Sequence, residues 1–406
     1  MLLSSLQNIS KAIASRKSSL LSVGALKGFS KPWIRQLTSV KEAIPPAKGL
    51  FDHLTPTQRK RIGYWLLGCG GMVYGAVAIG GLTRLTESGL SMTQWDLIKT
   101  MKPPLNEKEW QEEFARYKTF PEYQFKNKHG EMTLSDFKFI FYMEYFHRMW
   151  GRAIGVAFLA PAAYLWAKGR FSTGMKKRVV AAGTLLVGQG LVGWWMVKSG
   201  LDPSENSNNE IPRVSQYRLA THLSLAFILY TQFLMMGLSH VFVPADHSAI
   251  KGIGKFKGLT HATKALVFVT ALMGAFVAGL DAGLVFNSWP KYAEDWIPDN
   301  LLSRSPVWKN FTENDVTVQF MHRNLAYLTL LSITGTWFVG RRLPLSRRAR
   351  IALNGLIVMG FTQAALGITT LLNNVPTSLA ALHQSGSMAL LTFAMWLASE
   401  IRRIPK

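Results

Sequence analysis

The chain has 406 residues, of which 48% are hydrophobic and only 17% are charged. Long apolar runs alternate with charged loops, a distribution that excludes a soluble globular protein and is typical of a protein that crosses a membrane several times. The formal charge is +23, but the basic residues lie beside the apolar runs instead of forming one basic domain, so they indicate membrane topology and no nucleic-acid partner.

The N-terminal segment 1–41 has no acidic residue, seven basic residues and nine serines. This composition is typical of a mitochondrial transit peptide, whereas a secretory signal needs an uninterrupted apolar core followed by a small-residue cleavage site. We therefore expect a transit peptide over 1–41 and a matrix segment over 42–61. The mature protein is expected in the mitochondrial inner membrane.

Eight apolar segments follow, most of them long enough to cross a bilayer as helices. They are 62–82, 139–166, 179–197, 219–243, 265–280, 316–339, 351–372 and 378–399. The fifth is the shortest, and uncharged residues after Asp281 are available to extend it. The predicted fold class is all-α integral membrane, with eight transmembrane helices.

An internal repeat divides these segments into two halves. The sequence EYFHR at 144–148 matches QFMHR at 319–323, and GQGLVG at 188–193 resembles TQAALG at 362–367. We therefore expect two repeated four-helix bundles. The expected divisions are an N-terminal half over 62–243, a matrix linker over 244–264, a C-terminal half over 265–401 and a matrix tail over 402–406.

Loop charge predicts the orientation of the helices. Basic residues gather after the second, fourth and sixth segments, at 168–178, 251–257 and 341–350, whereas the loops 83–138 and 281–315 are balanced or acidic. Because cytoplasmic-type loops carry the excess of Lys and Arg, the basic loops and both termini should face the matrix.

Four histidines lie near the intermembrane-space end of four segments, two in each half: His147, His222, His322 and His383. A polar ring inside lipid is costly unless a partner occupies its nitrogens. Haem iron accepts two axial imidazoles, so each half predicts one haem site at the same depth. Zinc or copper would need further ligands, which neither half offers apart from Glu144, and the single Cys69 excludes a cysteine-based metal site. The expected pairs are His147 with His222 and His322 with His383.

Arginines border these histidines and are candidates for binding haem propionates, because a guanidinium group suits a carboxylate. They are Arg84, Arg148, Arg213, Arg218 and Arg323. For Arg213 and Arg218 the alternative is an interaction with phospholipid headgroups. Five further histidines, expected to be solvated, lie in loops or at the ends of segments: His53, His129, His240, His247 and His261.

Glu144 is the clearest difference between the halves. It precedes His147 by three residues and shares its helix face, whereas the matching residue of the second half is the neutral Gln319. A carboxyl group there can move a proton or stabilise a cationic centre, so the asymmetry predicts that only the first haem reacts. An ion pair between Glu144 and Arg148 at i+4 is the structural alternative, and the two roles are compatible.

The motifs together resemble the haem A synthase family over 63–399. The resemblance is carried by GGLTRLTESG at 80–89, EYFHRMWGR at 144–152, GWWMVKSGLD at 193–202, RLATH at 218–222 and MHRN at 321–324. Some bacterial members carry a cysteine pair in the first outer loop, but 83–138 has none, as in the mitochondrial branch.

The resemblance implies an oxidoreductase that converts the C8 methyl group of haem O to a formyl group, giving haem A for cytochrome c oxidase. It implies Glu144 as the catalytic residue, His147 and His222 as ligands of the substrate haem, and His322 and His383 as ligands of a bound haem B. Expected partners are a haem O synthase, an electron-transfer partner and membrane lipid, and a homo-oligomer is compatible with the sequence.

Two other protein classes share some of these features. A di-haem b-type electron carrier would use the same four histidines without chemistry on either haem, although two haems at one depth are poorly placed to carry electrons across a bilayer. A transporter is disfavoured because the segments are not obviously broken at the membrane midplane. For the enzyme, oxygen activation at the substrate iron and oxidation by electron removal both remain open.

Overall fold

The computed structural model describes residues 54–92, 94–95, 98, 101–126, 132–201 and 213–402. Within these ranges the secondary structure is helical and contains no β-strand, only one isolated bridge between Tyr292 and Asp295. The predicted transit peptide, most of the segment 42–61, His53, His129 and the chain after residue 402 lie outside the described residues.

Eight helices of 24 residues or more account for the apolar segments. They are α3 (Pro56–Leu85), α6 (Leu134–Ala167), α7 (Thr173–Leu201), α8 (Gln216–Val241), α9 (Ile253–Gly279), α11 (Asp315–Gly340), α12 (Arg347–Leu372) and α13 (Thr377–Glu400). Each predicted segment falls almost entirely inside one of these helices.

The fifth helix differs from its prediction. It extends toward the N-terminus, beginning at Ile253 within the predicted linker, and it has 27 residues. It does not continue past Asp281, because that residue has a positive φ of 50° and therefore leaves the right-handed helical conformation. Ala282, the residue after Asp281, is nevertheless fully buried.

Five of the eight helices are long and apolar enough by composition to cross a membrane: α3, α7, α8, α9 and α12. The other three carry polar residues that the sequence analysis assigns to a site, namely Glu144, His147, His322 and His383. Polar and charged side chains lower the mean hydropathy of such helices without shortening them, as expected for intramembrane functional residues.

Polar residues set where several helices begin. Thr55 and Gln58 form a reciprocal capping box at the start of α3, and Thr133 and Asp136 do the same for α6. The side chain of Asn314 caps α11. These caps satisfy backbone N–H groups that have no partner inside the helix, so they fix the first turn of each helix.

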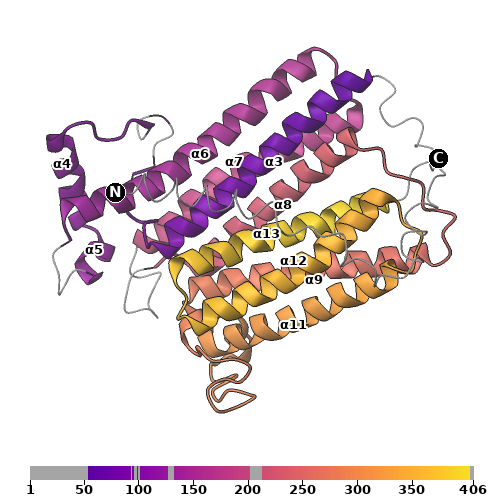
Figure 1. Cartoon of the computed structure of the whole chain (residues 1–406). Coiled ribbons are helices and arrows are strands. Elements are labelled where there is room, and N and C mark those ends of the chain that lie inside the picture. Colours follow the sequence, from indigo (N-terminus) through magenta and orange to yellow (C-terminus); the bar gives the residue numbers. More distant parts are fainter. Residues whose placement is uncertain are drawn as a thin grey trace, which may run out of the picture. The chain divides into compact units, whose positions relative to one another are not determined.

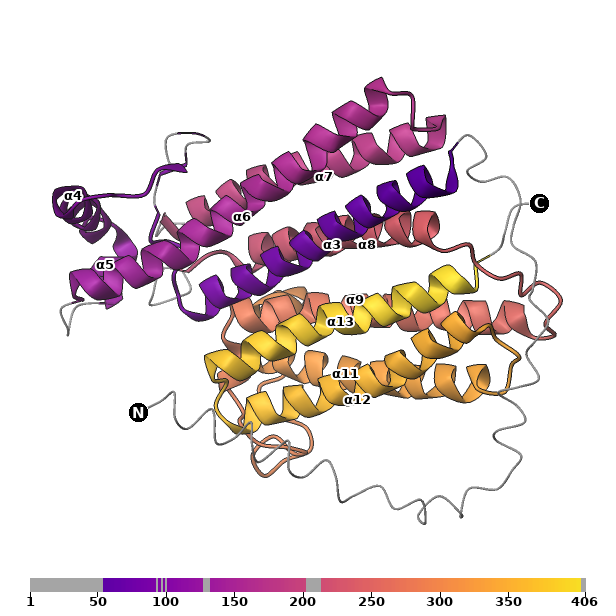
Figure 2. The ribbon, with the colours of Figure 1, turned by 45° about the horizontal axis from the view of Figure 1, so that its top comes forward.

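The long helices lie alongside one another (Figures 1 and 2). In the N-terminal part α3 packs on α6 and α8, and α7 packs on α8. In the C-terminal part α9 packs on α11, and α12 packs on both α11 and α13. The two parts meet where α3 and α8 contact α13, and where α8 also contacts α9.

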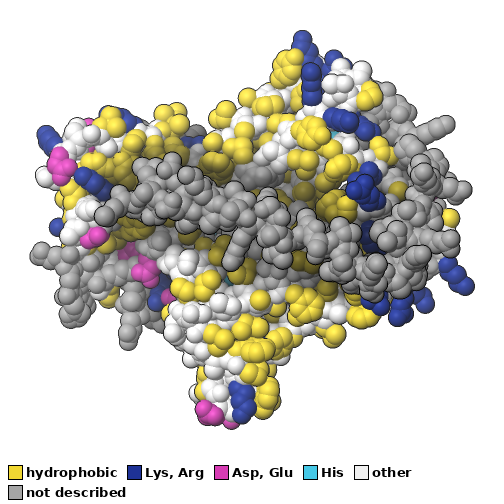
Figure 3. All heavy atoms as spheres, viewed as in Figure 1, with side chains coloured by type: hydrophobic (Ala, Val, Ile, Leu, Met, Phe, Trp, Pro, Cys, Tyr) yellow, Lys and Arg dark blue, Asp and Glu magenta, His cyan; other side chains and the backbone are white. Residues whose placement is uncertain are grey.

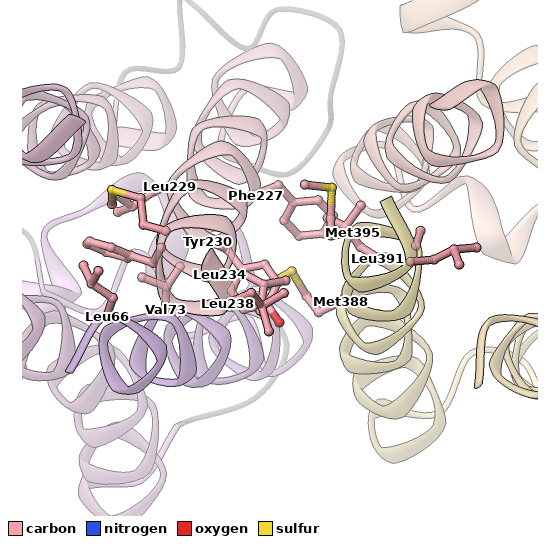
Figure 4. Close-up of a cluster of buried hydrophobic side chains, with 14 of the residues drawn as sticks. Leu66, Val73, Phe227, Leu229, Tyr230, Leu234, Leu238, Met388, Leu391 and Met395 are labelled. Carbon is pink, nitrogen blue, oxygen red and sulfur yellow. The ribbon is translucent and has the colours of Figure 1, made fainter. Parts of the chain in front are cut away.

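Buried apolar side chains fill the junction between the two parts (Figure 4). Phe227 of α8 and Met388 of α13 are each at most 2% exposed. A polar contact also aligns α3 with α13, because the Tyr74 hydroxyl donates to the Ser385 carbonyl at 2.8 Å. The tight packing of apolar side chains, with a few polar contacts, is how helices associate where lipid removes the hydrophobic driving force.

A small aromatic subdomain in the loop between α3 and α6 was not predicted. Helix α4 (Glu107–Lys118) and helix α5 (Pro121–Lys126) lie beside the first turns of α6, and Trp110 packs edge-on against Phe137 and Phe141. The sequence analysis predicted only a loop there, because the many charged residues of α4 make its apolar face hard to recognise in the sequence. This subdomain extends α6 beyond its apolar segment.

Side-chain charge is unevenly distributed over the helix ends. Figure 3 shows hydrophobic side chains over the middle of one face, with Lys and Arg gathered toward one end of the helices and Asp and Glu mainly toward the other. The basic end is the one that holds the loops after α6, α8 and α11. This separation is the pattern expected of a protein with unequal loop charge on the two sides of a membrane.

Two histidines expected to be solvated are buried at the basic end. His240 and His247 are 3% and 2% exposed, and the expectation was wrong for both, whereas His261 is exposed as predicted. His247 accepts a hydrogen bond from the backbone N–H of Ser346 at 3.2 Å, which joins the loop after α8 to the loop before α12. Nothing in the local sequence indicates this contact, because its two partners lie 99 residues apart.

The burial of His247 predicts a loss of stability in acid. Burial lowers the pKa of His247 below its ordinary value, since the charged ring would lose solvation. As the pH falls, the unfolded chain therefore binds a proton at this histidine before the folded chain does. The contribution of His247 to folding stability is complete above the unfolded pKa near 6.5. Below that pH it falls by at most about 1.4 kcal/mol per pH unit, until the folded pKa is reached. Thermal unfolding of wild type and His247→Asn between pH 8 and pH 5 measures this. The wild type should lose more stability than the variant, and equal losses would contradict the assignment.

Candidate functional site

The four predicted histidines lie on four different helices: His147 on α6, His222 on α8, His322 on α11 and His383 on α13. All four imidazoles are half-buried. The rings of His322 and His383 lie beside each other, and His147 and His222 are close enough to interact electrostatically. The role of these pairs as haem ligands stays a prediction.

The second pair has the separation that a shared metal ion requires. The ring centroids of His322 and His383 are 6.4 Å apart, and their planes are 87° apart. Two imidazoles that each bind a metal at about 2 Å have ring centres about 6 Å apart once the size of the rings is added. The centroid spacing of 6.4 Å therefore matches that of two axial ligands on one haem iron.

Each imidazole packs against a glycine of a neighbouring helix. A Cβ atom added to Gly80 of α3 would lie 2.7 Å from Cε1 of His147, and one added to Gly193 of α7 would lie 3.4 Å from Cε1 of His222. In the second half the equivalent distances are 3.2 Å from Gly274 of α9 to His322 and 2.8 Å from Gly367 of α12 to His383. Any side chain at Gly80 or Gly367 would displace the imidazole, so these glycines fix the ring positions.

The contact between an imidazole and a glycine occurs four times and was not predicted, although the sequence repeat marks two of the four glycines. Gly193 and Gly367 are the last residues of the repeated segments 188–193 and 362–367. The sequence showed that these positions correspond, but it did not show that they touch His222 and His383. The correspondence between Gly80 and Gly274 could not be predicted in the same way, because the sequences of α3 and α9 align poorly.

A glutamine on the same repeated segments holds the backbone of one histidine in each pair. The Gln189 side chain donates to the His222 carbonyl at 3.1 Å, and the Gln363 side chain donates to the His383 carbonyl at 2.7 Å. Gln363 Nε2 also lies 3.1 Å from Nδ1 of His383. Each glutamine precedes the contacting glycine by four residues, so one helix face carries both contacts.

Replacing Gln363 with leucine is expected to weaken haem binding in the second half by about 10-fold to 100-fold, the usual effect of removing a group that orients a metal ligand. Gln189→Leu is the matched change in the first half, and it should leave the second site unaltered. The measurement is the rate at which each variant loses haem to an excess of apomyoglobin. Equal rates for wild type and Gln363→Leu would contradict this role.

Glu144 and Arg148 form a buried ion pair on α6. The Arg148 Nε donates to Glu144 Oε1 at 2.6 Å, and the two residues are 7% and 4% exposed. The remaining guanidinium nitrogens donate to the carbonyls of Gln94 and Met92, each at 2.7 Å, and the guanidinium lies 4.5 Å from the ring centre of Trp95. The ion pair predicted from the i, i+4 spacing is confirmed.

Arg323 repeats this arrangement in the second half. It donates to the carbonyls of Ser288, Pro290 and Lys291 at 3.0 to 3.3 Å and lies 3.9 Å from the ring centre of Tyr292. Burial raises the pKa of Tyr292 to about 12, so its hydroxyl is neutral at physiological pH. Arg148 and Arg323 each therefore hold the loop that follows the first helix of their half.

Gln319 occupies the position of Glu144 without an ion pair. Its side-chain amide donates to the Phe286 carbonyl at 3.1 Å. The two halves thus differ in structure as well as in sequence. Only the first half places a carboxyl group next to the arginine and the histidine.

The other three predicted arginines also contact protein groups. Arg84 donates to the Ala278 carbonyl at 2.9 Å and pairs with Asp281 at 3.1 Å, and Arg213 pairs with the same carboxylate. Arg218 donates to the Trp195 carbonyl at 2.8 Å. These contacts connect helix ends and loops, and the binding of propionates by any of the five arginines stays a prediction.

The donor set fits haem better than another metal. Among the described residues no group of three or more His, Cys, Asp or Glu side chains has the arrangement of a metal site. The buried Nδ1 atoms of His147 and His222 make no hydrogen bond to any described residue. Two imidazoles on facing helices are the usual pair of axial ligands of a haem iron, and each half supplies one such pair.

Comparison with known proteins identifies the family of the chain. Residues 63–395 match the COX15-CtaA family, described as cytochrome oxidase assembly protein. The chain is 51% identical to the heme A synthase COX15 of Homo sapiens over 91% of this chain and 90% of that protein, and 43% identical to its namesake in Saccharomyces cerevisiae over 85% and 76%. It is also 37% identical to a heme A synthase-mitochondrial ferredoxin fusion protein of Schizosaccharomyces pombe, over 92% of this chain and 65% of that protein. The chain therefore belongs to the COX15-CtaA family, among the haem A synthases of eukaryotes.

Proposed function

We propose that the chain oxidises the C8 methyl group of haem O to a formyl group, through an alcohol, and so makes haem A for cytochrome c oxidase. Half of the human protein's residues are identical over nine tenths of both chains, which supports a shared reaction. The observation that carries the proposal is the asymmetry between two otherwise matching histidine pairs, since only the first has a buried carboxyl group beside it.

The proposed site divides its tasks between the two halves. His147 and His222 hold the iron of the substrate haem O, and His322 and His383 hold a resident haem B. When bound, haem B supplies one-electron transfer. Glu144 takes up or releases the proton that accompanies oxidation of the methyl carbon, and Arg148 keeps its carboxyl group in position.

The proposed architecture is eight transmembrane helices in two four-helix bundles, over 62–243 and 265–401. The five apolar helices, the three further helices of 24 residues or more and the unequal loop charges support it. The protein is a mitochondrial membrane protein, and we place both termini in the matrix and the histidines toward the intermembrane space, because the basic loops follow α6, α8 and α11.

The proposed partners follow from the reaction. A haem O synthase must supply the substrate, and an electron-transfer partner must exchange electrons with the resident haem. The Schizosaccharomyces pombe relative is fused to a mitochondrial ferredoxin, which supports an iron-sulfur protein of that class as the electron-transfer partner. Membrane lipid surrounds the apolar helices, and neither the charge distribution nor the site calls for nucleic acid.

Complementation tests the proposed function. In yeast cells that lack their own haem A synthase, this chain should restore the absorption bands of haem A in cytochrome c oxidase. The alternative, a non-enzymatic di-haem b-type carrier, would add haem b absorption to the membranes without any haem A. That second outcome, with the chain present at normal abundance, would overturn the proposal.

A further inference from the structure

Trp95 lies at the edge of the first histidine pair. A Cβ atom at Gly193 of α7 would lie 3.5 Å from Cη2 of Trp95 and 3.4 Å from Cε1 of His222. The indole and the imidazole therefore approach the same point on one helix. Because an iron-bound porphyrin lies directly against its axial imidazoles, a group this close to His222 is within reach of the porphyrin ring.

The position of Trp95 is fixed by Arg148. The guanidinium lies 4.5 Å from the centre of the indole ring and also holds the carbonyl of Gln94, the preceding residue, at 2.7 Å. Arg148 is itself held by Glu144 at 2.6 Å. Two successive contacts, from Glu144 to Arg148 and from Arg148 to Trp95, thus connect the carboxyl group of the proposed active site to the indole ring.

Tyr292 is the counterpart of Trp95 in the second half, but other side chains of the protein cover its ring. It stacks on Arg323 as Trp95 stacks on Arg148, with 3.9 Å between the guanidinium and the ring centre. Phe286 and Phe320 pack against the same ring at centroid distances of 5.7 and 5.5 Å. Tyr292 is consequently only 4% exposed, whereas Trp95 is 42% exposed.

We propose that Trp95 is a substrate-binding residue: its free ring surface contacts the porphyrin of haem O in the first half, and the second half has no equivalent. The proposal rests on the proposed function only in taking the first half as the substrate site. Flat aromatic rings pack favourably against other π systems, and Trp offers the largest such surface at little conformational cost. The carbonyl contacts of Arg148 place this ring before the substrate arrives.

The experiment compares Trp95→Ala, Trp95→Phe and Tyr292→Phe in the full-length chain, purified in lipid nanodiscs and titrated with haem O. In Trp95→Ala the dissociation constant and the KM for haem O should rise about tenfold, as expected for the loss of one aromatic contact, while kcat stays within about twofold. Trp95→Phe should recover most of the affinity. Tyr292→Phe should bind haem O like the wild type.

The resident haem is the internal control for folding. Its absorption spectrum and its rate of loss to apomyoglobin should be the same in Trp95→Ala as in the wild type. An unchanged KM in Trp95→Ala, or a parallel loss of the resident haem, would overturn the role of Trp95. If the wild type binds haem O tightly but forms no haem A, the proposed function fails while the titration still decides the role of Trp95.

Discussion

Alanine in place of His322 or His383 is expected to remove the resident haem from the protein. The two rings are 6.4 Å apart, a separation suited to two axial ligands of one iron, and each packs against a glycine of a neighbouring helix. Removing either imidazole leaves a single weak attachment, so haem B should be lost during purification. The pyridine haemochrome content of the purified protein measures this directly.

His147→Ala is the matched control in the first half. It should leave the resident haem and its spectrum in place, while the capacity to bind added haem O falls. If the His147 and His322 variants lose the same haem, or if His322→Ala keeps a normal haem b spectrum, the division of tasks between the halves is wrong.

Glutamine in place of Glu144 is expected to lower the rate of haem A formation by about 100-fold to 10,000-fold, the range usually contributed by a general acid or base. The amide keeps an oxygen that can accept the hydrogen bond from Arg148, so the contacts of Arg148 with Met92, Gln94 and Trp95 should survive. Turnover of haem O by the purified protein measures the effect. The KM should change little, because the variant removes a proton carrier and leaves the binding surface in place.

Gln319→Glu is the reciprocal control. It places a carboxyl group four residues before Arg323, as Glu144 precedes Arg148, so an ion pair can form and the variant can fold. Turnover should remain at the wild-type rate, because the second half holds a haem that is not a substrate. Normal turnover in Glu144→Gln would show that Glu144 serves only to position Arg148.

The long helices and the pairs of histidines could be predicted because their signals are local or repeated. Apolar length marks each helix, and the repeated His-Arg at 147–148 and 322–323 marks corresponding turns of α6 and α11. The start of α9 was missed because Lys255, Lys257 and Lys264 interrupt the apolar pattern while the helix continues through them. Charged side chains at a helix end can reach water, so they end an apolar run without ending the helix.

Contacts between distant segments could not be predicted from one sequence. Arg148 appeared suited to a haem propionate, but in the structure it contacts carbonyls more than 50 residues away. Arg323 likewise contacts loop carbonyls, which lie 32 to 35 residues away. An arginine that holds a loop has the same sequence pattern as an arginine that binds a ligand. The burial of His247 depends on Ser346, again through a distant contact. The partner of a polar side chain follows from tertiary packing, which residue spacing alone does not specify.

The central claim, that this chain converts haem O to haem A with the help of Glu144, is tested most directly by extracting pigments from membranes of a host that makes haem O but no haem A. The wild type and Glu144→Gln are expressed at equal abundance, and the extracted haems are separated and identified by mass and absorption. The wild type should yield haem A and the variant almost only haem O, with equal amounts of haem B in both. Absence of haem A from the wild type, or equal haem A in the two, would contradict the claim.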